Sequence, residues 1–129
     1  MKILVVDDEP LARSRLVSLI EELDGYEVAG EAANGMEAVS FVEEHQPGVV
    51  LMDIRMPGKR GDEIAHRIRQ IPAIENIPVV LMTAFVLSDS ERFDMISECG
   101  VDQIINKPLP DLQQLNKMLH DVISNRTGS

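Results

Sequence analysis

The chain has little of the chemistry on which several classes of protein depend. Its 129 residues contain one cysteine, Cys99, so no internal disulfide can form, and its three histidines lack the spacing of metal ligands. Basic residues are also few, with 12 Lys and Arg against 22 Asp and Glu, a net charge of −10. This balance excludes nucleic-acid binding by phosphate neutralisation, and the shortage of cysteine indicates a reducing, cytoplasmic compartment.

Long hydrophobic runs are absent as well. No apolar run is longer than six residues, the length of the run at 77–82, whereas a membrane-spanning helix needs about 20. The first residues, one lysine followed by four apolar residues and three acids, do not have the pattern of a signal peptide. With 44% hydrophobic and 26% charged residues, the composition is that of one soluble globular domain without membrane association.

Five short apolar runs alternate with segments of helical pattern. The predicted strands cover residues 3–6, 26–29, 49–52, 79–82 and 104–105. The runs are nearly continuous and rich in Val, Ile and Leu, which is typical of parallel strands buried on both faces. Strands that alternate with helices in this way predict an α/β sandwich, with one parallel sheet between two layers of helices.

Local signals mark the ends of the five predicted helices. Pro10 suits the first turn of the first helix, and Asn34 suits the cap of the second. Pro72 ends the third helix, after an apolar pattern that continues to residue 71. Ser88 and Glu91 have the spacing of a capping box at the start of the fourth helix.

The fourth predicted helix is the poorest in apolar residues. We expect it to be anchored mainly by Phe93, Met95 and Ile96. The fifth helix follows Pro110 and presents a regular apolar face. Residues 1–124 are therefore predicted to form the domain, and residues 125–129 a loose tail whose Thr-Gly-Ser end resembles a cloning remnant.

Polar residues follow four of the five predicted strands. Asp7 and Asp8 follow the first strand, and Asp53 follows the third. Thr83 follows the fourth strand and Lys107 the fifth. Because the carboxyl ends of parallel strands share one edge of the sheet, where ligands of open α/β sheets bind, these side chains should lie together. Singly, each has an ordinary explanation as a helix cap, a turn residue, a strand residue or a surface lysine.

Three neighbouring carboxylates favour a bound cation. Asp7, Asp8 and Asp53 would repel one another and raise each other's pKa unless a positive charge joined them. Ligands that are all oxygen, with room for water and phosphate, suit Mg²⁺, whereas zinc would require nitrogen or sulfur. The cluster therefore predicts Mg²⁺ together with a phosphoryl group.

The same residues carry a resemblance to a known family. The segments LVVDDEP at 4–10, LMDIRMPG at 51–58, LMTA at 81–84 and NKP at 106–108 resemble the receiver (CheY-like) domain of two-component response regulators. The resemblance extends over residues 2 to about 124. It implies a flavodoxin-like, doubly wound (βα)5 fold, a three-layer sandwich with strand order 2-1-3-4-5.

By this resemblance, Asp53 is the phosphoacceptor, which takes a phosphoryl group from a phosphohistidine on a histidine kinase or histidine phosphotransferase. Asp8 corresponds to the principal Mg²⁺ ligand, and Asp7 to a neighbour that often acts through water. Arg55 corresponds to the position whose backbone carbonyl completes the protein ligands of the ion. The domain would promote only its own phosphorylation and dephosphorylation, and would not act as an enzyme on other molecules.

The resemblance also assigns the groups that hold the phosphoryl oxygens. Lys107 would pair with them, Thr83 would donate its hydroxyl to them, and Ala84 belongs to the same part of the site. A cis peptide bond between Lys107 and Pro108 is implied as well. Phosphorylation would then change a surface formed by the fourth helix, the fifth strand and the fifth helix, which binds an output domain, a target protein or a second copy of the chain.

One position departs from the family pattern. Ile104 lies three residues before Lys107, where the family usually has Tyr or Phe, so we expect the switch to be weaker or relayed differently. Phe85, two residues after Thr83, is unusually bulky for its place. We expect Phe85 and Arg55 to shield the aspartyl phosphate from water, although simple loop packing would also explain Phe85.

Two other functions share parts of this pattern. A phosphatase of the haloacid dehalogenase type also uses an aspartyl phosphate and Mg²⁺, but its Asp-x-Asp motif after the first strand is missing here. A flavodoxin-like cofactor binder would need Ser, Thr and Gly at that place, where this chain has acids. The part up to Gly58 resembles receivers of LytTR-type regulators and the later part those of hybrid histidine kinases, so a separate domain, a piece of a longer regulator and a composite sequence all stay open.

Overall fold

The computed structural model describes residues 1–56 and 58–127, and it contains five strands and five helices in strict alternation. In chain order these are β1 (Lys2–Val6), α1 (Pro10–Glu21), β2 (Glu27–Ala32), α2 (Gly35–His45), β3 (Val49–Asp53), α3 (Gly61–Arg69), β4 (Val79–Thr83), α4 (Asp89–Ser97), β5 (Gln103–Asn106) and α5 (Leu112–Thr127). All four strand pairs are parallel, and the strand order is β2-β1-β3-β4-β5. The predicted α/β fold and strand order are confirmed.

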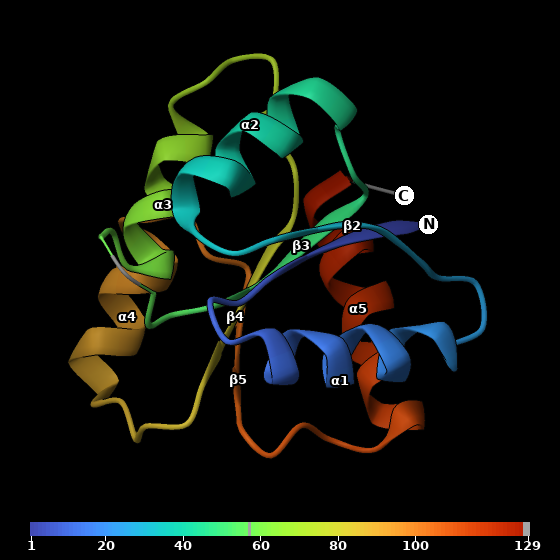
Figure 1. Cartoon of the computed structure of the whole chain (residues 1–129). Helices are drawn as coiled ribbons and strands as arrows, with labels where there is room; N and C mark the ends of the chain where they lie inside the picture. Colours follow the sequence, from blue (N-terminus) through green and yellow to red (C-terminus); the bar gives the residue numbers. More distant parts are fainter. Residues whose placement is uncertain (57, 128–129) are drawn as a thin grey trace.

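The sheet lies between two layers of helices (Figure 1). Alternate residues of β1 serve the two sides: Leu4 and Val6 belong to the core under α2, α3 and α4, whereas Ile3 and Val5 belong to the core under α1 and α5. Each of these four side chains is fully buried. Burial on both faces is the reason that the strand sequences are continuously apolar instead of alternating.

The register of the sheet aligns the carboxyl ends of its central strands. The last residue of β1, Val6, is paired with Met52 on β3, and Asp53 follows as the last residue of β3. On the next pair, the last residue of β4, Thr83, is paired with Asn106 at the end of β5. The residues that follow these four strands therefore meet at one edge of the sheet.

The predicted helix starts agree with the structure. Pro10 is the first residue of α1. The Asn34 side chain caps α2 by accepting a hydrogen bond from the Glu37 backbone N–H at 2.9 Å. At α4, the Ser88 hydroxyl accepts from the Glu91 N–H at 3.1 Å, and the Glu91 carboxylate accepts from the Ser88 N–H at 3.0 Å, which completes the capping box.

Three boundaries differ from the prediction by two residues or more. Helix α3 ends at Arg69, because the backbone N–H groups of Gln70 and Ile71 bond three residues back and tighten the chain before Pro72. Strand β2 begins one residue later and extends to Ala32, since it pairs with β1 along its length. The predicted loose tail is helical as far as Thr127, in α5, and residues 128–129 lie outside the described residues.

The expected anchoring of α4 is wrong for two of its three residues. Met95 is buried, but Phe93 is 68% exposed and Ile96 is 48% exposed. Helix α4 turns only one large apolar side chain into the core, so two apolar side chains remain on the surface. Within the described residues, no helix is long and apolar enough to cross a membrane.

Candidate functional site

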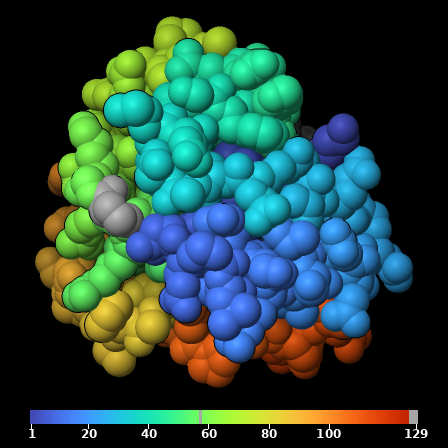
Figure 2. Space-filling view, in the orientation of Figure 1, coloured from blue at the N-terminus to red at the C-terminus, as the bar shows by residue number. Residues whose placement is uncertain are grey.

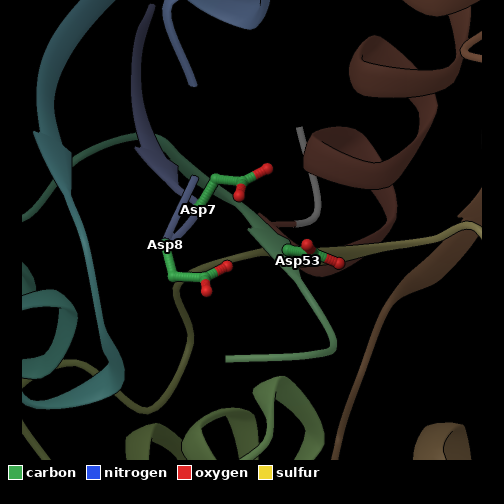
Figure 3. A group of neighbouring side chains, drawn as sticks. All are labelled: Asp7, Asp8 and Asp53. Carbon is green, nitrogen blue, oxygen red and sulfur yellow. The ribbon is translucent and has the colours of Figure 1, made fainter. Parts of the chain in front are cut away.

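Three carboxylates gather at the carboxyl edge of the sheet. Asp7 and Asp8 follow β1, and Asp53 ends β3 (Figure 3). One carboxylate oxygen from each residue lies within 4.8 Å of the others. Asp7 is buried, Asp53 is partly buried and Asp8 is exposed, so the cluster is open to solvent on the Asp8 side. The topological argument from the sequence thus predicted which acids meet.

Lys107 supplies the positive charge of the cluster. Its Nζ lies 3.6 Å from Oδ2 of Asp7 and 3.7 Å from Oδ2 of Asp53. The Lys107 backbone N–H donates a 2.7 Å hydrogen bond to the Thr83 carbonyl, which fixes the start of the loop after β5 against the end of β4. The peptide bond between Lys107 and Pro108 is cis, as the family resemblance implied.

The surroundings of Asp53 raise its pKa above the ordinary 3.8. Burial is the largest cause, and the charges of Asp7 and Asp8 act in the same direction. Lys107 and a backbone hydrogen bond from Arg55 lower the pKa, but they do not fully compensate. One ammonium group therefore does not neutralise three carboxylates.

The donor set fits a small, hard divalent cation. All three side chains offer carboxylate oxygen, and no nitrogen or sulfur ligand belongs to the cluster formed by the described residues. Mg²⁺ binds through one or two carboxylates plus water and phosphate oxygen, and the exposed side at Asp8 leaves space for these. Burial is the main reason that the Asp53 pKa is raised, and such an ion would remove the smaller contribution that comes from repulsion by Asp7 and Asp8.

The loop that carries Asp7 and Asp8 is held by several hydrogen bonds. Oδ1 of Asp7 accepts from the Glu9 N–H at 3.0 Å, and the Asp7 N–H donates to the Ala32 carbonyl on β2 at 3.1 Å. The Asp7 carbonyl accepts a 2.7 Å hydrogen bond from Nη1 of Arg13 on α1. The Arg13 contact could not be predicted from the sequence, because an acceptor on the backbone has no signature in the residue pattern.

Thr83 is 2% exposed, and its hydroxyl is engaged by its own loop. Oγ1 accepts from the Phe85 N–H at 3.0 Å and donates to the Phe85 carbonyl at 3.5 Å. Ala84, between these two residues, is exposed beyond the end of β4. The Thr83 hydroxyl thus has a partner that it could exchange for another acceptor.

A groove of about 680 Å³ lies beside the acidic cluster. Its lining includes Asp8, Arg55, Thr83 and Phe85. The guanidinium carbon of Arg55 lies 3.7 Å from the centroid of the Phe85 ring, so two residues singled out from the sequence are in direct contact. In Figure 2, the green segment after β3 lies on the surface between the blue start of α1 and the yellow segment that precedes α4.

A parallel sheet of this order, with three acids and a lysine at its carboxyl edge, is the arrangement of a phosphorylation-dependent signalling domain. The chain belongs to the response regulator receiver domain family, whose sequence model matches residues 3–120. Its role as a phosphoacceptor signalling domain follows from this membership, and the resemblance noted from the sequence motifs is confirmed.

Individual relatives agree with this assignment. The chain is 51% identical over 69 residues to the positive alginate biosynthesis regulatory protein of Pseudomonas aeruginosa, covering 53% of this chain and 28% of that protein. It is 36% identical over 128 residues to the transcriptional regulatory protein BtsR of Salmonella typhi, covering 98% of this chain and 50% of that protein. The chain therefore spans half or less of the length of these two curated relatives.

Solved structures give the same fold. The signal receiver domain of a signal transduction histidine kinase from Syntrophus aciditrophicus superimposes with a TM-score of 0.80 at 32% sequence identity. The match covers 96% of this chain and 90% of that one.

Proposed function

We propose that this receiver accepts a phosphoryl group on Asp53 in a Mg²⁺-dependent reaction, and that the phosphorylated form presents an altered surface to its partner. The observation that carries the proposal is the position of the Asp53 carboxylate, which lies beside Asp7, Asp8 and Lys107 at the carboxyl edge of the sheet. Asp53 is the member of the cluster that is neither fully buried nor fully exposed. Its carboxylate can therefore be both held in place and reached by a donor.

The metal would be held by the acids and by one backbone oxygen. Asp8 and Asp53 supply carboxylates, Asp7 contributes directly or through water, and the Arg55 carbonyl, two residues after Asp53, completes the protein ligands. When bound, Mg²⁺ neutralises charge on the carboxylates and on the incoming phosphoryl oxygens. In the metal-free protein, burial and the neighbouring acids hold the Asp53 pKa above its ordinary value. A positive charge beside Asp53 would favour its ionised form, which is the nucleophile.

The transfer needs positioning more than it needs a strong base. An oxygen of the ionised Asp53 carboxylate attacks the phosphorus of a phosphohistidine, the phosphorus–nitrogen bond breaks, and the electron pair remains on the imidazole, which takes a proton from solvent. Lys107, already paired with Asp53, would pair with the phosphoryl oxygens that arrive. Such transfers are accelerated mainly by alignment and by neutralisation of the developing charge.

The structural response would begin at Thr83. Its hydroxyl would exchange the Phe85 backbone for a phosphoryl oxygen, and this exchange would draw the loop before α4 toward the site. Helix α4 resists such movement weakly, because Met95 is its one buried large side chain. Phosphorylation favours the conformation with the loop drawn inward only to the extent that the phosphoryl group interacts more strongly with that conformation than with the unphosphorylated one.

Ile104 supports a relay without an inward-turning aromatic ring. Its aliphatic side chain is 6% exposed and already packs in the core that includes Met95 of α4. A different link joins the site to α4: Nη2 of Arg92 donates a 3.1 Å hydrogen bond to Oδ1 of Asn106, the residue before Lys107. The loop that holds Lys107 is thereby connected directly to α4.

The partners follow from the chemistry of the two surfaces. The phosphodonor would be a histidine kinase or a histidine phosphotransferase. The exposed Phe93 and Ile96 of α4 give the responding surface an apolar part, suited to an output domain of the same polypeptide, a separate target or a second copy of this chain. A domain of this kind regulates its partner and acts chemically only on itself.

A small acyl phosphate donor tests the proposed function. Incubation with the donor and Mg²⁺ should add one phosphoryl group, detected by intact-protein mass spectrometry, and the adduct should be released by hydroxylamine, as an acyl phosphate is. Addition of EDTA before the donor should abolish the reaction. A hydroxylamine-resistant adduct, or equal labelling without metal, would contradict the proposal.

A further inference from the structure

The Arg13 side chain connects three parts of the molecule next to the acidic cluster. Arg13 lies on α1, and its Nη1 donates a 2.7 Å hydrogen bond to the backbone carbonyl of Asp7. Its Nε donates at 3.1 Å to Oε1 of Glu31 on β2, which makes an ion pair. The Arg13 side chain is 19% exposed and its bond to the Asp7 carbonyl is partly buried, whereas the Glu31 side chain is 48% exposed.

The carbonyl that Arg13 contacts belongs to the peptide unit joining Asp7 to Asp8. Because a peptide unit is planar and rigid, the direction of this carbonyl also sets the direction in which the backbone enters Asp8. The other side of Asp7 is fixed by its N–H bond to the Ala32 carbonyl. The Asp8 side chain is exposed, so the backbone beneath it is what holds its carboxylate near the other two.

We propose that Arg13 is a positioning residue for the cation site, which orients the Asp7–Asp8 peptide and thereby keeps the carboxylates of Asp7 and Asp8 converged. The inference rests on the proposed function, in which these acids hold Mg²⁺. Arg13 contacts no carboxylate of the cluster in this arrangement; it acts through the backbone carbonyl. Hydrogen-bond partners of this indirect kind commonly set how well a ligand group is presented to a metal.

Glu31 has a distinct part in this arrangement. A guanidinium charge beside a cation site repels the cation, and the repulsion is strongest at low ionic strength. The Glu31 carboxylate neutralises that charge and also holds the guanidinium plane in place through Nε. Glu31 is paired with Val5 in the sheet, so the arginine is anchored to a strand that adjoins β1. The pair thus provides a rigid donor with little net charge.

The test measures Mg²⁺ affinity in four variants of the whole chain. Isothermal titration with MgCl₂ gives the dissociation constant, and the melting temperature of the metal-free protein gives stability. Arg13→Met removes the donor, and Arg13→Lys keeps the charge without the planar fork. Glu31→Gln leaves the Arg13 donor in place but removes the carboxylate that neutralises the guanidinium charge. Arg15→Met, an exposed arginine on the same helix, is the matched control with the same change in charge.

We expect Arg13→Met to weaken Mg²⁺ binding by about 3- to 10-fold, and Arg15→Met to leave it within about twofold of the parent. Arg13→Lys should fall between the parent and Arg13→Met. Glu31→Gln should weaken binding at low salt and approach the parent value at high salt. If Arg13 had only a structural role, Arg13→Met would lower the melting temperature, but the Mg²⁺ affinities of the variants would not follow this order.

Equal Mg²⁺ affinity in the parent and in Arg13→Met would overturn this inference and leave the proposed function standing. If Arg13→Met does not fold, Arg13→Lys and Glu31→Gln decide the matter, and parent-like affinity in both would overturn it. Failure of the parent itself to bind Mg²⁺ would instead contradict the proposed function, so the two failures are distinguishable.

Discussion

The guanidinium carbon of Arg55 lies 3.7 Å from the centroid of the Phe85 ring, which joins the loop after β3 to the loop after β4. Both residues line the groove beside Asp8 and Thr83. A stacked cation and ring cover more surface than either side chain alone, and the contact holds the flexible arginine in one place. From this position beside Asp8 and Thr83, we propose that the pair shields the aspartyl phosphate from water.

Replacement of Phe85 by Ala should shorten the lifetime of the phosphorylated form. Without the ring, Arg55 loses its support, and water reaches the phosphoryl group more easily. We expect dephosphorylation to accelerate about 3- to 10-fold, roughly 1 kcal/mol in the barrier. The rate is measured after removal of the donor. The control is Phe93→Ala, which removes an exposed phenylalanine on α4. Equal dephosphorylation rates for Phe85→Ala and the parent would contradict shielding by Phe85.

Replacement of Asp53 by Asn should stabilise the metal-free protein. Because folding raises the Asp53 pKa above 3.8, ionisation of this group disfavours the folded state. The stability that protonated Asp53 contributes to the folded state is fully present below pH 3.8. It is lost as the pH rises through the raised pKa of the folded protein. The melting temperature of Asp53→Asn should thus exceed that of the parent at neutral pH, by roughly 3–5 °C for ~1 kcal/mol.

Melting curves of both proteins, in EDTA and between acid and neutral pH, check this prediction. The difference should shrink toward acid pH, where Asp53 is protonated in the parent. A lower melting temperature for Asp53→Asn at neutral pH would mean that Asp53 is a satisfied structural acid.

At the opposite edge of the sheet, Asp102 joins side chains of α3 and α5 to the start of β4. Its carboxylate accepts from Arg69 at 2.9 Å, from Arg126 at 2.9 Å and from the Val79 N–H at 2.8 Å, and its side chain is 13% exposed. Asp102→Ala should reduce the free energy of unfolding by ~2–4 kcal/mol, because two arginines lose their shared partner. Urea denaturation measures the loss. Asp121→Ala, at an exposed position on α5, should change stability by less than about 0.5 kcal/mol.

The bond between Arg92 and Asn106 predicts a local effect on α4. Arg92→Met removes the 3.1 Å hydrogen bond that ties α4 to the residue before Lys107. Amide exchange in α4 should become faster, while exchange in the sheet stays unchanged, since the rest of the helix has little core contact. Hydrogen-exchange mass spectrometry resolves the two regions. Unchanged exchange in α4, matching a Ser90→Ala control, would show that this bond does not restrain the helix.

The sequence was informative where a side chain's position follows from topology. Continuous apolar runs that end in Asp7, Asp53 or Thr83 define both the buried strands and the edge at which those residues meet. Capping signals such as Ser88 with Glu91 were equally reliable, because the partner is only three residues away. These features depend on local chemistry and on the direction of the strands alone.

Other features depend on contacts that no local pattern encodes. The face of α4 that turns inward is set by packing, so Phe93 and Ile96 could not be placed from spacing in a helix with few apolar residues. The Arg13 contact has a backbone carbonyl as acceptor, which leaves no trace in the sequence. The stacking of Arg55 on Phe85 joins two loops whose course the residue pattern does not determine.

The most direct test of the central claim is the position of the phosphoryl group. After reaction with a small phosphodonor and Mg²⁺, reduction of the acyl phosphate with borohydride and peptide mapping should mark Asp53 alone, and Asp53→Asn should remain unmarked. A mark on Asp7, Asp8 or any other residue, or an unmarked parent protein under excess donor, would contradict the account.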